Sequence, residues 1–447
     1  MTPPGVRTTR RLFLKGSIGL VGVSLLVACT PSGRPAAPTP PAQQAAPAQT
    51  TGTISLGALF PFTGNLALLG NEQFNGCEIA SDMVNERGGI DGKRVEWVKA
   101  DAPDPTAATS EANRLITQAG QKLILGSYSS ALSVPATAVA ERARVVYWEV
   151  GAVSDQVTAR GFKYTFRTCT NATSLGNGAA EYAARGIAPA LGADPRNLKV
   201  VIMHEDGPYG TDVGKAAEEM SQGLGLQVLA NEAYSSAKTT DFAPLIVRFK
   251  GLNPDIIIPT SYINDAVLFW KQARELEFNV KALIGTGAGH GIVDFAKARG
   301  DDVNGVFDVD PPPPVNLAAL KQDVQAEHKE FIERFTSKIG HEPFVHATMG
   351  FTGTMMLLKE VLPKAGSAEP EKVREAALAA DAPEGSFVNG WGIRFARPDA
   401  PNGGHNERSF AAVMQWQEQA LKIVFPEKYA THKPIMIPLP AWSQRVA

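Results

Sequence analysis

Hydrophobic positions along most of this chain recur with two alternating periods. Short apolar runs typical of buried strands are followed by stretches in which apolar residues return every three or four positions, as on one face of a helix. The first such unit is a strand-like run at 53–58 followed by Phe74, Cys77, Ala80 and Val84 at helical spacing. Because repeated strand–helix units favour a parallel sheet covered on both faces, the pattern predicts an α/β fold.

The alternation comes in two blocks of similar size, which predict two similar lobes. The first block predicts strands at 53–58, 94–99, 122–126 and 145–149, and helices at 73–84, 105–119 and 133–142. The second block predicts strands at 199–203, 227–230, 255–258 and 282–284, and helices at 175–185, 209–222, 241–249 and 264–276.

The last third of the chain has a different pattern. Helices are predicted first and strands last, with helices at 317–339, 345–362 and 371–378 and strands at 409–416 and 421–424. Such a tail need not be a third domain. It can complete both lobes if the chain crosses between them more than once.

The first 28 residues have the pattern of an export signal. Arg10 and Arg11 precede Phe13, Leu14 and Lys15, and the stretch 18–28 is apolar or small and uncharged. That stretch is too short to span a bilayer comfortably but suits the apolar core of a signal peptide. The order of residues resembles a twin-arginine export signal, and a general secretory signal with a basic start is the alternative.

A lipid anchor is predicted directly after this signal. Leu26-Val27-Ala28-Cys29 resembles a bacterial lipoprotein processing site, in which the cysteine thiol accepts a diacylglycerol; a chance cysteine is the alternative. Residues 30–51 are nearly all Pro, Ala, Gln, Thr, Ser and Gly, a composition that cannot bury enough apolar area to fold. The sequence therefore predicts a signal at 1–28 and a lipid-anchored tether at 29–51.

Composition supports an ordinary globular protein after the tether. Roughly 395 residues follow Gly52, too many for one ordinary core. The signal removes four of the 43 basic residues and no acid, which leaves 39 against 45 acidic residues and a net charge of about −6. No dense basic run remains, so a nucleic-acid partner is not expected.

Cysteines and motifs add little chemistry. Cys77 and Cys169 provide no disulfide framework, and their spacing does not show whether they pair. Buried free thiols are the favoured interpretation because Cys77 falls on the apolar side of a predicted helix. No metal site, cofactor or catalytic residue is predicted. The glycines at 285–291 lack dinucleotide-loop spacing, and no zinc-protease, serine-hydrolase or phosphate-loop motif is present. An enzyme remains the weaker alternative.

Several motifs, taken in order, resemble the leucine/isoleucine/valine-binding proteins. The similarity covers Gly52 to Gly305 well and the remainder loosely, and its strength lies in the order and spacing of the motifs. They are Leu59-Phe60-Pro61-Phe62-Thr63-Gly64 with Gly70, Val84-Asn85-Glu86-Arg87-Gly88-Gly89-Ile90-Asp91-Gly92, Asp101-Ala102-Pro103-Asp104-Pro105, Gly126-Ser127-Tyr128-Ser129-Ser130 and Asp206-Gly207-Pro208-Tyr209-Gly210.

The resemblance implies a type I periplasmic-binding fold, in which two doubly wound lobes joined by three crossings close on a ligand. Lobe one is expected at 52–170 plus 307–405, and lobe two at 171–306 plus 406–447. The implied function is an exported, envelope-bound solute-binding component of an ABC importer, a monomer that delivers a small organic solute to permease and ATPase subunits. A ligand sensor with a separate signalling partner is the alternative.

The resemblance also implies which residues bind the solute. Ser130, beside Ser129, fills the position that holds the ligand carboxylate, where a helix start offers N–H groups as well. Gly151 and Val153 fill positions that offer backbone groups, and Tyr209 and Tyr262 fill the positions in lobe two that cover the solute. The alternatives are a helix cap for Ser130 and lobe packing for both tyrosines.

Departures from the family pattern leave the solute open. Leu69 stands where an aromatic residue is frequent, and Gly287 stands where the amino-acid binders keep a carboxylate for the ligand ammonium. A buried ammonium without a counter-charge is costly. Glu149, next to Trp148 at a strand end, could replace the missing charge or select an amide, urea or cationic ligand. A carboxylic acid without an amine is the other possibility.

Overall fold

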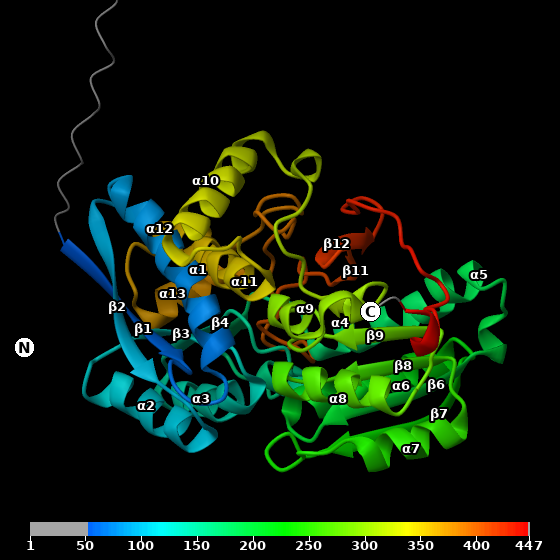
Figure 1. The fold of residues 1–447 in the computed structure, drawn as a ribbon. Coiled ribbons are helices and arrows are strands. Elements are labelled where there is room, and N and C mark those ends of the chain that lie inside the picture. Colours follow the sequence, from blue (N-terminus) through cyan, green and yellow to red (C-terminus); the bar gives the residue numbers. More distant parts are fainter. Residues whose placement is uncertain (1–51, 446–447) are drawn as a thin grey trace, which may run out of the picture. The chain divides into compact units, whose positions relative to one another are not determined.

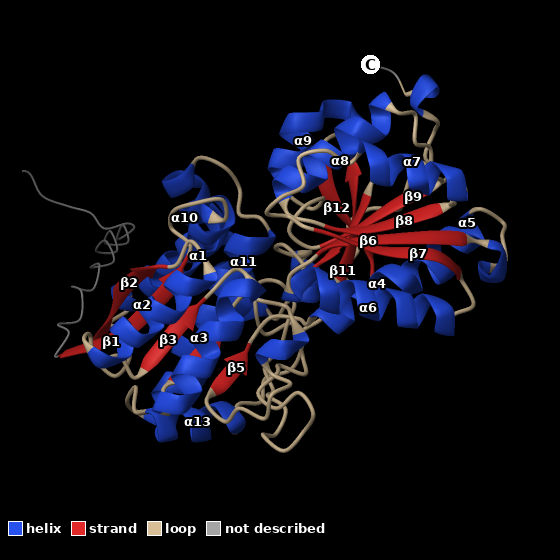
Figure 2. Cartoon of the chain, turned by 90° about the horizontal axis from the view of Figure 1, so that it is seen from below, coloured by secondary structure: helices blue, strands red, loops and turns tan. Residues whose placement is uncertain are grey.

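The computed structural model describes residues 52–445, which belong to one compact unit. The predicted export signal, the lipidation site at Cys29 and the tether lie outside the described residues. Two separate β-sheets organise the described part, and helices cover each of them (Figures 1 and 2).

The first sheet is entirely parallel, in the order β2-β1-β3-β4-β5. Its strands are β1 (Gly52–Phe60), β2 (Lys93–Asp101), β3 (Leu123–Gly126), β4 (Val146–Glu149) and β5 (Thr165–Arg167). The helices α2 (Pro105–Thr117) and α3 (Ser130–Ala143) pack on one face. The opposite face is covered by α1 (Ala67–Glu86), α11 (Val345–Met355) and α13 (Pro370–Leu378), and α10 (Gln322–Ile339) and α12 (Leu362–Ala365) complete this layer.

The second sheet has the order β12-β11-β10-β9-β8-β6-β7 and is parallel from β7 to β10. Its strands are β6 (Lys199–Glu205), β7 (Gln227–Tyr234), β8 (Ile256–Thr260), β9 (Ala282–Thr286), β10 (Phe307–Asp310), β11 (Ala412–Gln417) and β12 (Ala420–Phe425). The last two strands run antiparallel to their neighbours.

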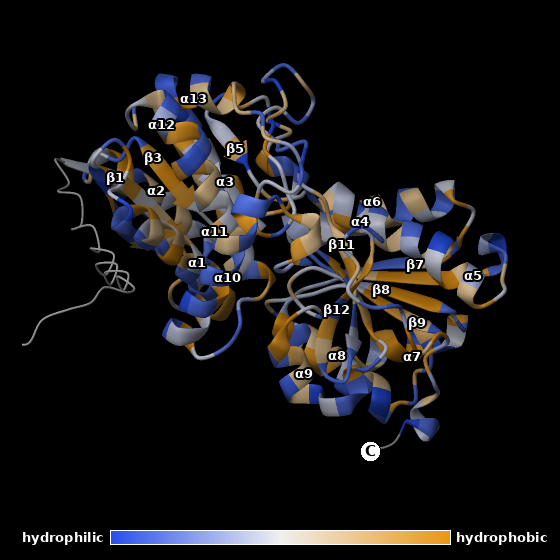
Figure 3. Cartoon of the chain, turned by 90° about the horizontal axis from the view of Figure 1, so that it is seen from above, coloured by the Kyte–Doolittle hydropathy of each residue, from blue (hydrophilic) through white to orange (hydrophobic). Residues whose placement is uncertain are grey.

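Helices cover both faces of the second sheet (Figure 2). On one side lie α4 (Ala172–Tyr182) and α6 (Pro208–Gly223), and on the other α7 (Ala243–Leu252), α8 (Ile263–Glu275) and α9 (Val293–Arg299), while the short α5 (Ala188–Ala190) lies near one end. Figure 3 shows hydrophobic residues along the central strands and mixed colouring on the helices. Strands buried on both faces explain the continuous apolar runs of the sequence.

The chain crosses between the two sheets three times: between β5 and α4, between β10 and α10, and before β11. This arrangement confirms the expected two-lobed, doubly wound fold. We call the half built on the first sheet lobe one and the half built on the second sheet lobe two. Each predicted strand and helix of the two blocks is present, with ends that differ by a few residues.

One expected boundary between the two lobes is wrong. The return to lobe one was placed at residue 307, but β10 hydrogen-bonds to β9 and β11 of the second sheet, so this crossing follows Asp310. The sequence hid β10 because Asp308 and Asp310 interrupt its apolar pattern. The strand β5 and the helix α9 were also missed, since three and seven residues are too few to show a period. The other limits of the lobes stay a prediction.

Close packing of α1 on α11 fixes one wall of the space between the lobes. A Cβ atom at Gly76 would lie 2.0 Å from the carbonyl oxygen of Ala347, and one at Gly350 would lie 2.0 Å from that of Gln73. The two helices therefore touch through their backbones. The side-chain amide of Gln73, held in this contact, donates to the carbonyl of Val150 at 2.9 Å.

Cys77 and Cys169 are buried free thiols, as the sequence indicated. Burial raises the pKa of the Cys77 thiol to about 12, so the thiol stays protonated. Among residues 52–445, no helix combines the length and the apolar character that a membrane crossing requires.

Candidate functional site

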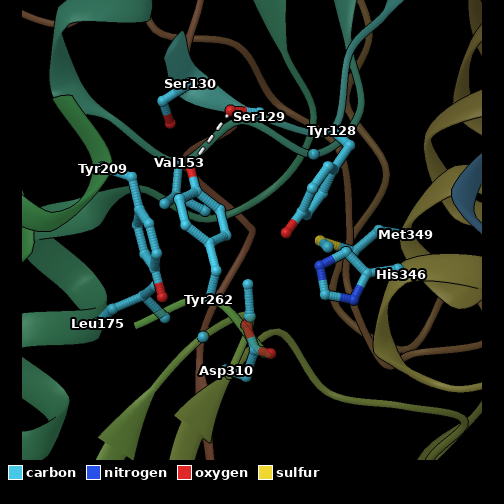
Figure 4. Close-up of a pocket in the computed structure, with 13 residues that line it drawn as sticks. Tyr128, Ser129, Ser130, Val153, Leu175, Tyr209, Tyr262, Asp310, His346 and Met349 are labelled. Carbon is cyan, nitrogen blue, oxygen red and sulfur yellow. Dashed lines mark hydrogen bonds between the residues drawn. The ribbon is translucent and has the colours of Figure 1, made fainter. Parts of the chain in front are cut away.

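A cavity lies between the carboxyl ends of the two sheets (Figure 4). Open α/β sheets bind ligands at this edge, where loops rather than covering helices follow the strands. The lining residues come from both lobes. They are Tyr128, Ser129, Ser130, Gly151, Val153, Leu175, Tyr209, Tyr262, Gly287, Ala288, Asp310, His346 and Met349.

Ser130 presents a hydroxyl donor to this cavity from the first turn of α3. Its Oγ accepts the backbone N–H of Ser154 at 3.0 Å, which leaves the hydroxyl hydrogen available for a ligand. The N-cap of α3 is Ser129, not Ser130, so helix capping does not account for the Ser130 hydroxyl. The first N–H groups of a helix have no partner within it. Together, these donors form a place for a carboxylate or another acceptor.

The loop after β4 supplies backbone groups next to Ser130. The N–H of Gly151 is already used, because it donates to Glu149 Oε1 at 2.7 Å. The carbonyl of Val153 is used as well, by the N–H of Ala172 at 2.7 Å and by Arg167 Nη1 at 3.0 Å. Among the described residues, the Gly151 carbonyl and the Val153 N–H have no partner. Of the Gly151 and Val153 backbone groups, these two are free to meet a solute.

Glu149 does not line the cavity, contrary to the suggestion that it could face the ligand. Its carboxylate is fully buried and accepts the N–H groups of Ser127, Gly151 and Ala152 and the hydroxyl of Ser133. The pKa of Glu149 is raised to about 8, because the effect of burial outweighs the lowering effect of these donors. Glu149 therefore shapes the loop that carries Gly151 rather than contacting a solute.

Trp148 and Leu69 also lie outside the cavity. The Trp148 side chain is fully buried against Phe166 and Phe395, and its indole N–H donates to the carbonyl of Gly353 at 2.8 Å. Trp148 is a core residue of lobe one. Leu69 is buried and lines the neighbouring outer part of the cleft, so it can meet a solute that enters but not one enclosed in the cavity.

Three tyrosines form the walls of the cavity (Figure 4). The Tyr262 ring lies 5.6 Å from that of Tyr209 and 6.3 Å from that of Tyr128, centroid to centroid. The hydroxyls of Tyr262 and Ser129 are 3.2 Å apart, so lobe two is hydrogen-bonded to lobe one at the site itself. Tyr262 thus packs between the lobes and also lines the cavity.

Gly287 lines the cavity at the end of β9, and no side chain fits there. Its φ is +77°, and a Cβ atom would lie 2.6 Å from the hydroxyl oxygen of Tyr209. That hydroxyl donates to the carbonyl of Thr286, which holds the ring in place. Tyr209 therefore occupies the space that a side chain at position 287 would need.

Asp310 is the most informative residue that the sequence interpretation missed. It ends β10, its side chain is only 3% exposed, and its Oδ2 has no hydrogen-bond partner among the described residues. Burial raises the pKa of Asp310 well above 3.8, and the same holds for Asp308 two residues earlier, where the charge of Asp310 adds to the effect. The available signal was an acid–Val–acid run directly before four prolines.

Besides Asp310 and Tyr128, four further lining residues were missed. Leu175 and Met349 add apolar surface, and Ala288 adds little side chain. The buried ring of His346 packs on Tyr128 at 5.1 Å, and burial lowers its pKa to about 3, so it is neutral near pH 7. These residues come from α4, α11 and the loop after β9. They carry no motif, because only the folded chain brings them together.

The cavity can hold a small solute by polar groups at two places and by aromatic surface between them. Ser130 and Asp310 lie on opposite sides of the labelled residues in Figure 4. Hydroxyl and N–H donors suit an anionic or acceptor group, and a carboxylate suits a donor or cationic group. Within the described part of the chain, no cluster of three or more His, Cys, Asp or Glu side chains could hold a metal ion.

The buried acids predict a pH dependence of folding without ligand. Because the folded-state pKa values of Asp308 and Asp310 are raised, their contribution to stability is complete below about pH 3.8 and is lost as the pH rises. Asp310→Asn removes the ionisable group. We expect the melting temperature of Asp310→Asn minus that of the unsubstituted protein to increase by several degrees between pH 4 and pH 7, as measured by calorimetry. A difference that is constant with pH would contradict this expectation.

Comparison with known proteins shows which family this chain belongs to. Residues 53–420 match the family model described as periplasmic binding protein. The chain is 37% identical over 382 residues to the Leu/Ile/Val-binding protein homolog 8 of Brucella abortus (strain 2308), covering 85% of this chain and 92% of that protein.

Solved structures show the same fold. The leucine-binding protein LivK of Thermotoga maritima superposes with a TM-score of 0.70 at 23% identity, over 83% of this chain and 97% of that one. The branched-chain amino acid transporter substrate-binding protein LivJ of Streptococcus pneumoniae, in complex with isoleucine, gives 0.69 at 22% identity, over 84% and 100%. This chain therefore belongs to the periplasmic binding protein family, as a relative of the Leu/Ile/Val-binding proteins with the type I periplasmic-binding fold.

Proposed function

We propose that this protein is the extracytoplasmic solute-binding component of an ABC importer. It captures a small organic solute, such as a branched-chain amino acid-like compound, an amide or a carboxylic acid, and delivers it to a membrane permease. The observation that carries the proposal is a cavity walled by both lobes, with Ser130 and Val153 on one side and Tyr209 and Tyr262 on the other. A solute in this cavity contacts both lobes at once.

Closure of the two lobes is the mechanism that this geometry supports. A solute stabilises the closed form because only that form brings both sets of contacts to it. The hydrogen bond between Ser129 and Tyr262 and a second one from Ser154 Oγ to Asp212 at 2.5 Å join the lobes beside the cavity. These contacts between the lobes favour closure. The solute adds the contacts that distinguish the loaded form from the empty one.

Family membership supports a binding role rather than catalysis. The relatives are named as binding proteins, and membership implies an extracytoplasmic location. The partners proposed for this chain, a permease and ATPase subunits, follow from the transporter names of its structural neighbours. Release to a permease requires that the closed form reopen, so the solute is held by a reversible clamp and not by a covalent bond. A monomer suffices for this cycle.

The solute class can be tested by thermal melting of the purified protein. The panel holds branched-chain amino acids, amides and urea, and aliphatic and aromatic acids. A solute at 100 times its Kd adds about 2.7 kcal/mol to the free energy of unfolding, which corresponds to a rise of a few degrees. We expect such a rise with at least one of them and a much smaller rise for Ser130→Ala. Ser110→Ala, on the exposed face of α2, is the matched control.

Two results of this experiment would contradict the proposal. Melting that is unchanged across the whole panel would exclude the proposed solute classes. Full ligand stabilisation of Ser130→Ala would exclude Ser130 as the group that holds the solute.

We further propose that the chain is exported through the signal at 1–28, acylated at Cys29 and held at the membrane by the tether at 29–51. Cys29→Ser removes the thiol that accepts the lipid, so we expect this variant in the soluble fraction of fractionated cells, where the unsubstituted protein sediments with membranes. Cys77→Ala, at a buried thiol, is the control and should stay with the membranes. Membrane retention of Cys29→Ser would exclude the anchor.

A further inference from the structure

The end of β9 cannot supply a charge to the solute. Gly287 combines a φ of +77° with a contact that leaves no room for a Cβ atom beside the Tyr209 hydroxyl. Any acid at this position would require Tyr209 to move, and the Tyr209 hydroxyl is held by the carbonyl of Thr286. A carboxylate that serves the solute must therefore come from another strand.

The neighbouring strand brings an acid to the same place. In the parallel pair β9–β10, Thr286 lies opposite Val309, and the N–H of Gly287 donates to the carbonyl of Val309 at 3.0 Å. The next residue along β10 is Asp310, which thus stands beside Gly287 at the carboxyl edge of the sheet. Its side chain lines the cavity, is 3% exposed and leaves Oδ2 without a partner among the described residues.

Asp308 is held away from the solute. A Cβ atom at Gly285 would lie 2.6 Å from its Oδ1, and one at Gly291 would lie 2.3 Å from its Oδ2. The glycine loop after β9 thus closes around Asp308, which does not line the cavity. Both Asp308 oxygens also have no hydrogen-bond partner among the described residues. Of the two buried acids, only Asp310 can reach a bound molecule.

Among the described residues, no positively charged side chain lines the cavity beside Asp310. No lysine or arginine lines the cavity, and its histidine, His346, is kept neutral by burial, which lowers its pKa to about 3. The outer pocket that contains Tyr262 adds the acids Glu205 and Asp265 and no lysine or arginine, and Lys297 lines a separate outer pocket that does not include Asp310. A buried carboxylate without a partner is costly unless it is protonated or meets a cation. A solute that carries a cationic group can supply the missing partner of Asp310.

We propose that Asp310 is the counter-charge for an amine of the transported solute, in place of the family's carboxylate at the position of Gly287. The solute class is then a small molecule with an ammonium group at one end and a carboxylate or other acceptor at the other, which meets Ser130. This inference rests on the proposed solute-binding function and specifies its ligand. A dicarboxylate or an amine-free acid would leave Asp310 unpaired and would bind weakly.

The test is calorimetric titration of the purified full chain with pairs of solutes that differ only in the amine. L-Leucine is paired with 4-methylpentanoate and L-valine with 3-methylbutanoate, and the other standard L-amino acids extend the amine series. We expect at least one amine-bearing solute to bind about 30-fold or more tightly than its amine-free partner. Asp310→Asn should lose about 30-fold or more for that solute, because a desolvated charge pair is removed, and should change little for the amine-free acid.

Two further variants keep the outcome interpretable. Asp301→Asn makes the same change of net charge at an exposed position of lobe two and should bind like the unsubstituted protein. Asp310→Ser provides a second replacement should Asp310→Asn fail to fold, and a melting curve confirms folding of each variant.

The inference is overturned if folded Asp310→Asn keeps its affinity for the amine-bearing solute, if the amine-free partner binds the unsubstituted protein equally well, or if no amine-bearing solute binds it. Binding of amine-free acids in the last two cases would leave the importer proposal standing. If no solute of any class bound, both the inference and the importer proposal would be excluded.

Discussion

Both sheets of this protein are covered by helices on both faces, and the position of the site follows from that constraint. Backbone N–H and C=O groups inside the sheets form hydrogen bonds with neighbouring strands. The side chains of the strands are buried against the helices that pack on them. Polar groups remain free only where the strands end. Ser130, Val153, Gly287 and Asp310 all lie at or just past such ends. The cavity lies where the carboxyl edges of the two sheets face each other.

The same constraint explains how much of the fold could be predicted. Strands buried on both faces give short apolar runs and their covering helices give clear periods, so the βα blocks were visible in the sequence. Where polar residues serve the site, the pattern fails: Asp308 and Asp310 made β10 look like a connection, and this misplaced the second crossing. The three-residue strand β5 was too short to detect.

The site was predicted in part, and the resemblance to known binding proteins carried that part. Ser130, Gly151, Val153, Tyr209, Tyr262 and Gly287 all line one cavity, although their role in binding stays a prediction. Glu149 was misread because a strand-end position does not reveal which way its side chain points, and here four donors of lobe one surround its carboxylate. Asp310 was missed because its importance depends on the pairing of β9 with β10, a contact between segments that no local pattern encodes.

The central claim is that a solute joins two lobes that otherwise open. Spin labels on cysteines introduced at Thr106 and Lys238, exposed next to the residues that line the outer cleft, report the distance between the lobes, while the buried Cys77 and Cys169 stay unlabelled. The measurement is the distance distribution by pulsed electron resonance, with and without a solute shown to bind. The account predicts a shorter and narrower distribution when the solute is bound. An identical distribution in both states would contradict closure.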